Sequence, residues 1–489
     1  MNTGHLAVAF VFYSARLTLA ARRCTIPRWR RYPARRGSSR VLCSGGLNIE
    51  GTTTMQTSSV RRTEQTLAAI QDAGEEGRRI FTRVYEQSAL AAARAADERA
   101  KSGIHLGPLD GRIVSVKDLY DIAAEVTTAG SAVLRTAAPA QQDAVIVQRL
   151  RQAGAVIVGK TNMTEFAFSG IGINPHFGTP GNAHDAARIP GGSSSGAGIA
   201  VARGLSEISI GSDTGGSVRI PSALNGVTGF KPTQARVPRD GAFPLSFSLD
   251  CVGPLARSVL DCAQADAVMS GQRHADLPRR EVRGLRVGIP RGLLFTQTDA
   301  TVQNAFEQVA AELSRAGCRM DDMQLDDWCA APFRLQDNGT LTAAEAAHIH
   351  ARTLADNPDA IDPFVLARIQ RGQAISAAHY VGLQRERARL QQSLDARIAD
   401  CDLLVLPTVA MVAPRIDSLA TADAFNQANL LVLRNTSVFN FYDLPALSLP
   451  IRTGVGHLPV GLMAVGRRGC DRELLAICAA LQSQLATLQ

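Results

Sequence analysis

Several patterns that mark common classes of protein are absent from this sequence. No pair of its nine cysteines has the two-residue spacing of a CxxC motif, and no cluster of histidine, cysteine and acidic residues has the spacing of metal ligands. We also expect neither a Walker phosphate-binding loop nor a dinucleotide-binding glycine fingerprint. We therefore expect no metal and no other cofactor. An odd number of cysteines without paired spacing in so long a chain indicates reduced thiols, and hence a cytoplasmic enzyme.

Most of the chain also lacks an excess of charge of either sign. The formal net charge of +8 comes from residues 1–54, which contain nine arginines, no lysine and one acidic residue, Glu50. The remaining residues contain 43 basic and 43 acidic side chains, so their net charge is zero. A neutral body provides no electrostatic footprint for DNA or RNA, and we expect no nucleic-acid partner.

The N-terminal segment has no run that could span a membrane. Its apolar stretch, Leu6–Tyr13, is too short to cross a bilayer, and without a positively charged start it is a poor secretory signal. The arginine-rich, acid-poor composition resembles a mitochondrial presequence. A third interpretation, which we favour, is that translation begins at Met55. In every case we expect residues 1–54 to be disordered and to lie outside the fold, and we expect no membrane partner.

Beyond residue 55, short apolar stretches alternate with helical patterns. The polar, alanine-rich residues 57–101 predict two or three helices. Further along, a helix over residues 144–152 leads directly into a strand at 155–158, and a helix of small residues leads into the strand Ile208–Ile210. Continuous apolar strands that follow helices in this way are typical of a buried parallel sheet.

The second half of the chain continues this pattern. A helix that begins after Asp299, its predicted N-cap, places four apolar residues on one face: Val302, Phe306, Val309 and Leu313. Residues 444–451 and 459–466 predict two closing strands, and a last helix starts at Asp471. Because no repeat or linker divides residues 55–489, we predict one large α/β domain. Its central sheet should be mixed, mostly parallel, and covered by helices on both faces.

Three stretches contain residues with catalytic chemistry. Lys117 follows the predicted strand Ile113–Val116, residues 190–201 read PGGSSSGAGIAV, and residues 211–221 read GSDTGGSVRIP. Taken singly, each has an ordinary explanation: a solvated strand end, a flexible Gly/Ser linker, or a surface turn. The glycines of 190–201, however, lead straight into a helix, where backbone N–H groups can approach a ligand closely. This placement favours a functional loop.

Residues 191–233, GGSSSGAGIAVARGLSEISIGSDTGGSVRIPSALNGVTGFKPT, resemble the signature block of the amidase signature family. Lys117 lies 76 residues before Ser193, which matches the spacing of the family's catalytic lysine within a residue or two. Three further segments resemble parts of the family, so that the likeness spans roughly residues 57–489: 154–168, 248–259 and 458–466.

The resemblance implies a serine–serine–lysine triad. Ser217 would be the nucleophile, Ser193 the bridging serine and Lys117 the base. Since three serines occur in succession here, Ser194 stays an alternative for the bridging role. In the family, the peptide bond before this pair of serines is cis.

General chemistry agrees with a lysine in this role. A serine hydroxyl needs a neighbouring base to become a nucleophile, and no histidine lies beside these motifs. A cysteine nucleophile is conceivable, but no cysteine has glycines around it. A lysine can act as the base only when it is neutral. Its pKa must therefore fall from about 10.4 by roughly 3 units, which burial at the end of an apolar strand can achieve.

The resemblance also implies further site residues. The backbone N–H groups of residues 214–217 would form an oxyanion hole: Thr214, Gly215, Gly216 and Ser217. Side chains at 215 or 216 would crowd the substrate oxygen. Candidate substrate-binding residues are Met163, Gly192 and Ile220, with Ile220 giving the pocket a more apolar wall. Met163 and Phe166 are equally consistent with plain core residues. Asp213 and Arg219 would form an ion pair that holds the loop.

We therefore predict an amidohydrolase that cleaves a small carboxylic amide through an acyl-enzyme and releases ammonia or an amine. One alternative is the glutaminase A subunit of a glutamyl-tRNA amidotransferase. Another is a hydrolase of biuret or urea-type amides. A non-catalytic homologue is a further alternative, although the joint presence of Lys117, Ser193 and Ser217 argues against it. The family resemblance also allows a homodimer, and the substrate stays open.

Overall fold

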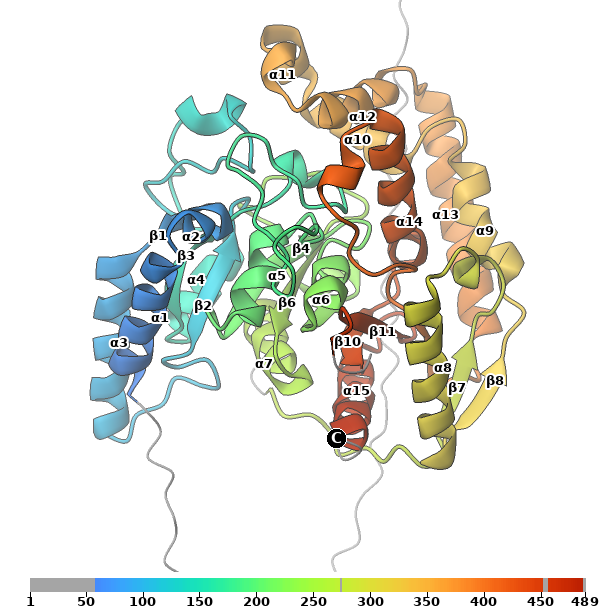
Figure 1. The fold of residues 1–489 in the computed structure, drawn as a ribbon, viewed down its shortest axis with the longest axis horizontal. Helices are drawn as coiled ribbons and strands as arrows, with labels where there is room; N and C mark the ends of the chain where they lie inside the picture. Colours follow the sequence, from blue (N-terminus) through green and yellow to red (C-terminus); the bar gives the residue numbers. More distant parts are fainter. Residues whose placement is uncertain (1–57, 273–274, 452–455, 487–489) are drawn as a thin grey trace, which may run out of the picture. The chain divides into compact units, whose positions relative to one another are not determined.

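The computed structural model describes residues 58–272, 275–451 and 456–486. The prediction made for residues 1–54 therefore lies outside the described residues. The described chain forms a single α/β domain built on one large sheet (Figure 1).

The sheet has 11 strands in the order β1-β3-β2-β4-β6-β5-β10-β11-β9-β7-β8. Their bounds are β1 Phe81–Val84, β2 Ile113–Lys117, β3 Val156–Thr161, β4 Ile208–Asp213, β5 Thr228–Lys231, β6 Cys251–Ala256, β7 Arg286–Ile289, β8 Arg319–Asp322, β9 Leu403–Pro407, β10 Ala446–Ile451 and β11 Val460–Val465.

The sheet is mixed, as predicted, but the predicted parallel majority is not observed. Parallel pairing is confined to two groups, β3-β2-β4 and β9-β7-β8. The strands between these groups, and β1 at the edge, pair antiparallel with their neighbours. A parallel pair needs a crossover of a dozen or more residues, usually a helix. The connection from β10 to β11 is too short for one, so these strands form an antiparallel pair.

Helices cover both faces of the sheet, as predicted. Alternate residues of β6 show this, because successive side chains of a strand point to opposite faces. Leu255 packs with Ala197 and Val218, whereas Ala256 belongs to the cluster that contains Cys262. The helices are α1 Ser59–Asp72, α2 Gly74–Ile80, α3 Glu86–Lys101, α4 Val145–Gln152, α5 Ser195–Ala202, α6 Arg219–Asn225, α7 Val259–Ser270, α8 Ala300–Arg315, α9 Asp326–Leu335, α10 Leu341–Ile349, α11 Ala351–Asp356, α12 Pro363–Gln373, α13 Ala377–Arg397, α14 Ala422–Phe441 and α15 Asp471–Ala486.

Two local expectations need correction. Residues 57–101 contain the predicted helices and also β1, which the polar sequence did not reveal because only its pairing with β3 defines it. Asp299 does precede α8, but its carboxylate accepts a hydrogen bond from the Val412 amide at 3.0 Å and does not cap the helix. The four predicted apolar positions of α8 are buried.

Candidate active site

Lys117 is the last residue of β2 and is fully buried. Its Nζ lies 2.7 Å from the Ser193 Oγ and 2.9 Å from the Ser212 Oγ. Ser212 belongs to β4, the parallel neighbour of β2. The lysine therefore lies between two hydroxyl groups. The alternative interpretation of Lys117 as a solvated strand end is wrong.

The glycine–serine segment packs over the carboxyl ends of β2 and β4, immediately before α5. The peptide bond between Gly192 and Ser193 is cis, and Ser193 is fully buried. Ser194 faces elsewhere: its amide donates to the Ser217 carbonyl at 3.3 Å and its Oγ lies 3.4 Å from the Ser212 carbonyl. Of the two serines considered for the bridging role, Ser193 is thus the one that contacts Lys117.

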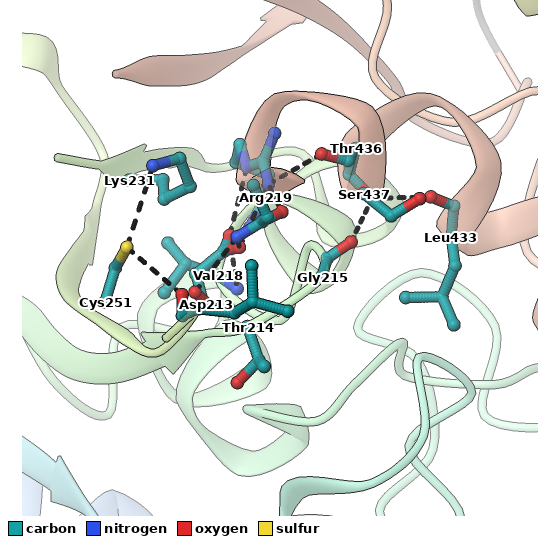
Figure 2. Close-up of polar contacts among 12 residues, drawn as sticks. Asp213, Thr214, Gly215, Val218, Arg219, Lys231, Cys251, Leu433, Thr436 and Ser437 are labelled. Atoms are coloured by element: carbon teal, nitrogen blue, oxygen red, sulfur yellow. Dashed lines mark hydrogen bonds and ion pairs between the residues drawn. The ribbon is translucent and has the colours of Figure 1, made fainter. Parts of the chain in front are cut away.

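The turn of residues 214–217 connects β4 to α6 and is fastened from two sides. The Thr214 hydroxyl donates to the Asp250 carboxylate at 2.6 Å. The Thr436 hydroxyl of α14 donates to the Gly215 carbonyl at 2.6 Å (Figure 2). Gly216 has φ +139°, and a Cβ there would clash with Thr436 Oγ1 and lie 2.7 Å from Ile220 Cδ1. Packing against α14 and α6 therefore requires glycine at position 216. The sequence suggested only that a side chain there would crowd the substrate oxygen.

A buried ion pair underlies this turn, as predicted. Arg219 Nη2 lies 2.9 Å from Asp213 Oδ1, and neither side chain is exposed (Figure 2). Asn440 of α14 donates to Asp213 at 2.9 Å and accepts from Arg219 at 2.6 Å. Burial alone would raise the pKa of Asp213, but the charge and hydrogen bonds of Arg219 lower it to about 2. Asp213 is therefore a fixed negative charge.

Lys117 has the electrostatic environment that a neutral base requires. Burial lowers its pKa from 10.5 to about 7, and the carboxylates of Asp250 and Asp213 oppose that effect. At neutral pH a large fraction of this amine is therefore unprotonated. An unprotonated amine within 2.7 Å of a hydroxyl can accept its proton.

The three candidate substrate-binding residues are enclosed by other parts of the chain. Met163 and Ile220 are fully buried within apolar clusters. The Gly192 amide donates to the Gly170 carbonyl at 2.8 Å, and a Cβ at 192 would lie 2.7 Å from the Gly172 nitrogen. Their packing fits the core interpretation, and their contact with a substrate stays a prediction.

The remaining candidates from the sequence lie as follows. The ring of Phe166 lies against the buried His350 at a centroid distance of 4.1 Å, with the two rings tilted by 43°. His348 is exposed. The seven cysteines of the described part are free, and burial raises the pKa of Cys251 to about 11 and of Cys329 to about 12. Such thiols are poor nucleophiles at neutral pH.

Residues 154–161, GAVIVGKT, have the spacing of a Walker phosphate-binding loop, a match that the expectation of no such loop overlooked. In such a loop, glycine backbone wraps around a phosphate between a strand and a helix. Here most of the segment is β3 itself, and Lys160 is a buried ion-pair partner of Asp118 at 3.2 Å. The segment therefore lacks the backbone form of a phosphate site.

Two negative findings concern only the described residues. Their side chains include no group of three or more histidine, cysteine and acidic residues that could hold a metal ion. Nor does any helix in this part of the chain have the length and apolar character needed to cross a membrane.

Sequence reasoning missed Ser212, Asp250 and Thr436. Ser212 could have been found, because parallel neighbours β2 and β4 bring the ends of their strands together. Asp250 lies in the family-like segment 248–259, but that resemblance gave it no role. Thr436 has no local signal, since a threonine in a helix is common.

Comparison with known proteins agrees with this geometry. The family model described as Amidase matches residues 62–475. The chain belongs to the amidase family. A 2-amino-5-chloromuconic acid deaminase of Comamonas testosteroni is 34% identical to this amidase over 403 residues, which cover 81% of this chain and 86% of the relative. A 1-carboxybiuret hydrolase subunit of a Pseudomonas strain is 36% identical over 75% of this chain and 82% of its own.

A third relative of this amidase is the A subunit of a glutamyl-tRNA(Gln) amidotransferase from Anaeromyxobacter. It is 34% identical over 92% of this chain and 98% of its own length. Among solved structures, one described as an amidase superposes with a TM-score of 0.79 at 32% identity, covering 88% of this chain and 97% of that one. The chain is accordingly an enzyme of the class that hydrolyses carbon–nitrogen bonds of amides.

Proposed function

We propose that this amidase cleaves a small carboxylic amide through an acyl-enzyme on Ser217, with Lys117 as the base and Ser193 as the relay. The observation that carries the proposal is the buried Lys117 Nζ, with its pKa near 7, at 2.7 Å from the Ser193 hydroxyl. No cofactor takes part in these steps.

In the proposed reaction, the Ser217 oxygen attacks the amide carbon while its proton passes to Ser193 and the Ser193 proton passes to Lys117. The carbonyl oxygen becomes an oxyanion, and the N–H groups of residues 214–217 would stabilise it. No described group accepts a hydrogen bond from these four N–H groups, so they are available as donors. The lysine then returns a proton through Ser193 to the leaving nitrogen, and water cleaves the ester.

A half-buried arginine supports a substrate that carries a carboxylate. Arg368 of α12 lies against the rings of Phe168 and Phe425, and its Nη1 donates to the Phe168 carbonyl at 2.6 Å. Burial lowers the pKa of Arg368 to about 10, and no carboxylate among the described residues forms an ion pair with it. Asp362 opposes the effect of burial on Arg368 without forming an ion pair with it. A partly desolvated guanidinium without an ion pair is costly, so an anionic substrate group would stabilise it.

Arg368 is also close to the proposed reaction site. It binds the carbonyl of Phe168, and Gly170, two residues later, binds the Gly192 amide. Two residues of chain span at most about 7 Å. The names of the deaminase and the carboxybiuret hydrolase also describe substrates that bear an acid group. We therefore place the substrate among amides that carry a carboxylate.

The test measures ammonia release from a panel of amides that includes glutamine, biuret and matched pairs such as succinamate and butyramide. Ser217→Ala should lose activity by about 10³-fold or more. Arg368→Met should raise KM for succinamate by roughly tenfold or more and leave butyramide unchanged. Arg371→Met, on the exposed side of the same helix, is the matched control. Full activity of Ser217→Ala would overturn the acyl-enzyme proposal, and an unchanged succinamate KM in Arg368→Met would overturn the carboxylate proposal alone.

The glutaminase alternative has one observation in its favour, the near full-length match to the amidotransferase subunit. If that function applied, glutamine alone would react, and only with a partner subunit present. Ile220, an apolar residue beside the proposed site, argues for a substrate other than glutamine. A cytoplasmic location and a homodimer stay predictions, which fractionation and sedimentation would test.

A further inference from the structure

The structure points to a role for Asp250 that none of the sequence motifs assigns. Asp250 immediately precedes β6, next to Cys251, which pairs with Asp213 of β4. We propose that Asp250 is a positioning residue for the proposed amide cleavage, because its carboxylate ties the turn before Ser217 to the loop of residues 245–250. This inference rests on the proposed function of Ser217 and Lys117.

Both oxygens of the Asp250 carboxylate are engaged. Oδ1 accepts the Thr214 hydroxyl at 2.6 Å, and Oδ2 accepts the amides of Leu245 at 2.9 Å and Ser246 at 3.0 Å. A carboxylate with three donors around it holds one geometry. Thr214 begins the row of N–H groups proposed to receive the oxyanion, so Asp250 fixes the first of them.

The loop that presents Asp250 is itself anchored. The Ser246 hydroxyl donates to Glu345 of α10 at 2.6 Å, and the Ser248 amide donates to the same carboxylate at 3.0 Å. A chain of contacts therefore runs from α10 through Asp250 to Thr214. This connection explains how a loop outside the two glycine–serine motifs could control the turn that contains Ser217.

Asp250 also acts on Lys117 through its charge. A cavity of about 310 Å³ is lined by both Asp250 and Ser212, the hydroxyl partner of Lys117. The negative charge of Asp250 raises the pKa of Lys117 and so opposes the larger effect of burial. Its removal should make Lys117 lose its proton at lower pH.

The other charged groups near Lys117 are already paired. Asp213 is held by Arg219, and Asp118, the next residue along the chain, is held by Lys160. Tyr120 donates its hydroxyl to the Gly211 carbonyl at 2.7 Å. Within the described residues, the hydrogen bonds to the Asp250 carboxylate come from a neutral hydroxyl and two neutral amides. Arg239 donates to the main-chain carbonyl of Asp250 at 3.3 Å and acts on the carboxylate through its charge, without forming an ion pair with it. An isosteric amide at position 250 therefore removes a negative charge without breaking a described ion pair.

The test follows labelling of Ser217 by phenylmethylsulfonyl fluoride as a function of pH. In this step the Ser217 oxygen forms a bond to sulfur, the sulfur–fluorine bond breaks, fluoride leaves and the serine proton passes towards Lys117. The rate should rise with pH as Lys117 becomes neutral. In Asp250→Asn the rising limb should move to lower pH, and the maximal rate should fall roughly tenfold.

Three comparisons make the outcome specific. Asp240→Asn removes another carboxylate that lines the same cavity. In this variant the labelling rate should rise over the same pH range as in the natural protein. Thr214→Val should slow labelling without moving the limb to lower pH, and Thr214→Ser should restore the rate. If Asp250→Asn folds and its labelling rate rises over the same pH range as that of the natural protein, the proposal is overturned. If that variant does not fold, equal rates in Thr214→Val, Thr214→Ser and the natural protein overturn it instead.

Failure of the underlying function gives a different result. A chain in which the reagent does not label Ser217 at any pH contradicts the proposed nucleophile. If the reagent labels Ser217, and labelling of Asp250→Asn has the same pH dependence as labelling of the natural protein, only the role of Asp250 is contradicted.

Discussion

In the part of this amidase that the structure describes, three lysines are fully buried, and their partners differ. Lys160 forms an ion pair with Asp118 at 3.2 Å, and Lys231 donates to the Pro232 carbonyl at 2.7 Å. The hydrogen-bond partners of Lys117 are two hydroxyl groups. A hydroxyl can donate to a neutral amine as well as accept from a charged one, so Lys117 can lose its proton without losing its partners. This difference between three similar residues marks Lys117 as the candidate base.

The lowered pKa of Lys117 has a consequence for stability. Between pH 7 and about 10 the unfolded chain holds a proton on this lysine that the folded chain has released, so folding becomes more favourable as pH rises. The free energy of unfolding of the natural protein relative to Lys117→Met should increase by about 1.4 kcal/mol per pH unit in this window. Urea denaturation at pH 7, 8, 9 and 10 measures it. Lys101→Met, at an exposed lysine, is the control. If the difference in free energy of unfolding between the natural protein and Lys117→Met did not change with pH, Lys117 would stay charged in the folded protein.

The ion pair of Asp213 and Arg219 makes a second prediction at the scale of single residues. Arg219→Met leaves the Asp213 carboxylate buried without its counter-charge, which should lower the free energy of unfolding by about 3–5 kcal/mol. Arg389→Met removes an exposed partner of Glu386 and should change the free energy of unfolding far less, because water and salt screen an exposed pair. Equal losses in urea denaturation of the two variants would contradict this assignment of the buried pair.

At the scale of elements, the turn between β4 and α6 depends on a helix far away in the sequence. Thr436 and Asn440 project from α14 onto Gly215 and Asp213, which precede them by more than 200 residues. The glycine–serine motifs predicted where a reactive turn would lie. The motifs could not predict which residues hold this turn, because nothing in the sequence of α14 marks Thr436 and Asn440 as its contacts.

The two glycines of the turn should therefore respond differently to alanine. A Cβ at Gly216 would clash with Thr436 Oγ1, and φ +139° disfavours any side chain, so Gly216→Ala should cost about 2–3 kcal/mol and slow labelling of Ser217. At Gly215 the nearest atom to a new Cβ is Leu433 Cδ2 at 3.4 Å, an ordinary contact. Gly215→Ala should change stability by less than about 1 kcal/mol. Denaturation curves of both variants decide this, and a larger loss in Gly215→Ala would show that the turn is held in another way.

At the scale of the whole molecule, the sequence predicted the elements better than their arrangement. The apolar strands expected at residues 155–158 and 208–210 are present as the longer strands Val156–Thr161 and Ile208–Asp213. They could be predicted because burial on both faces leaves a plain apolar signature. The antiparallel centre of the sheet was not expected, since pairing direction depends on connections whose course no local pattern specifies. The contact of Lys117 with Ser193 followed from family resemblance, whereas no spacing rule places residues 76 apart in contact.

The fold also predicts where the chain can be shortened. Every described element lies beyond residue 57, so a chain that starts at Met55 should keep the Tm and the Ser217 labelling rate of the full chain. A chain that starts at Gly74 loses α1, whose Ser59 amide binds Asp97 at 2.7 Å and whose Ile70 packs in the core beside β1. That second chain should unfold at a lower temperature, because the apolar surface beneath α1 becomes exposed to water. Thermal unfolding of the three chains provides the comparison, and a lower Tm for the Met55 chain would show that residues 1–54 contribute to the fold.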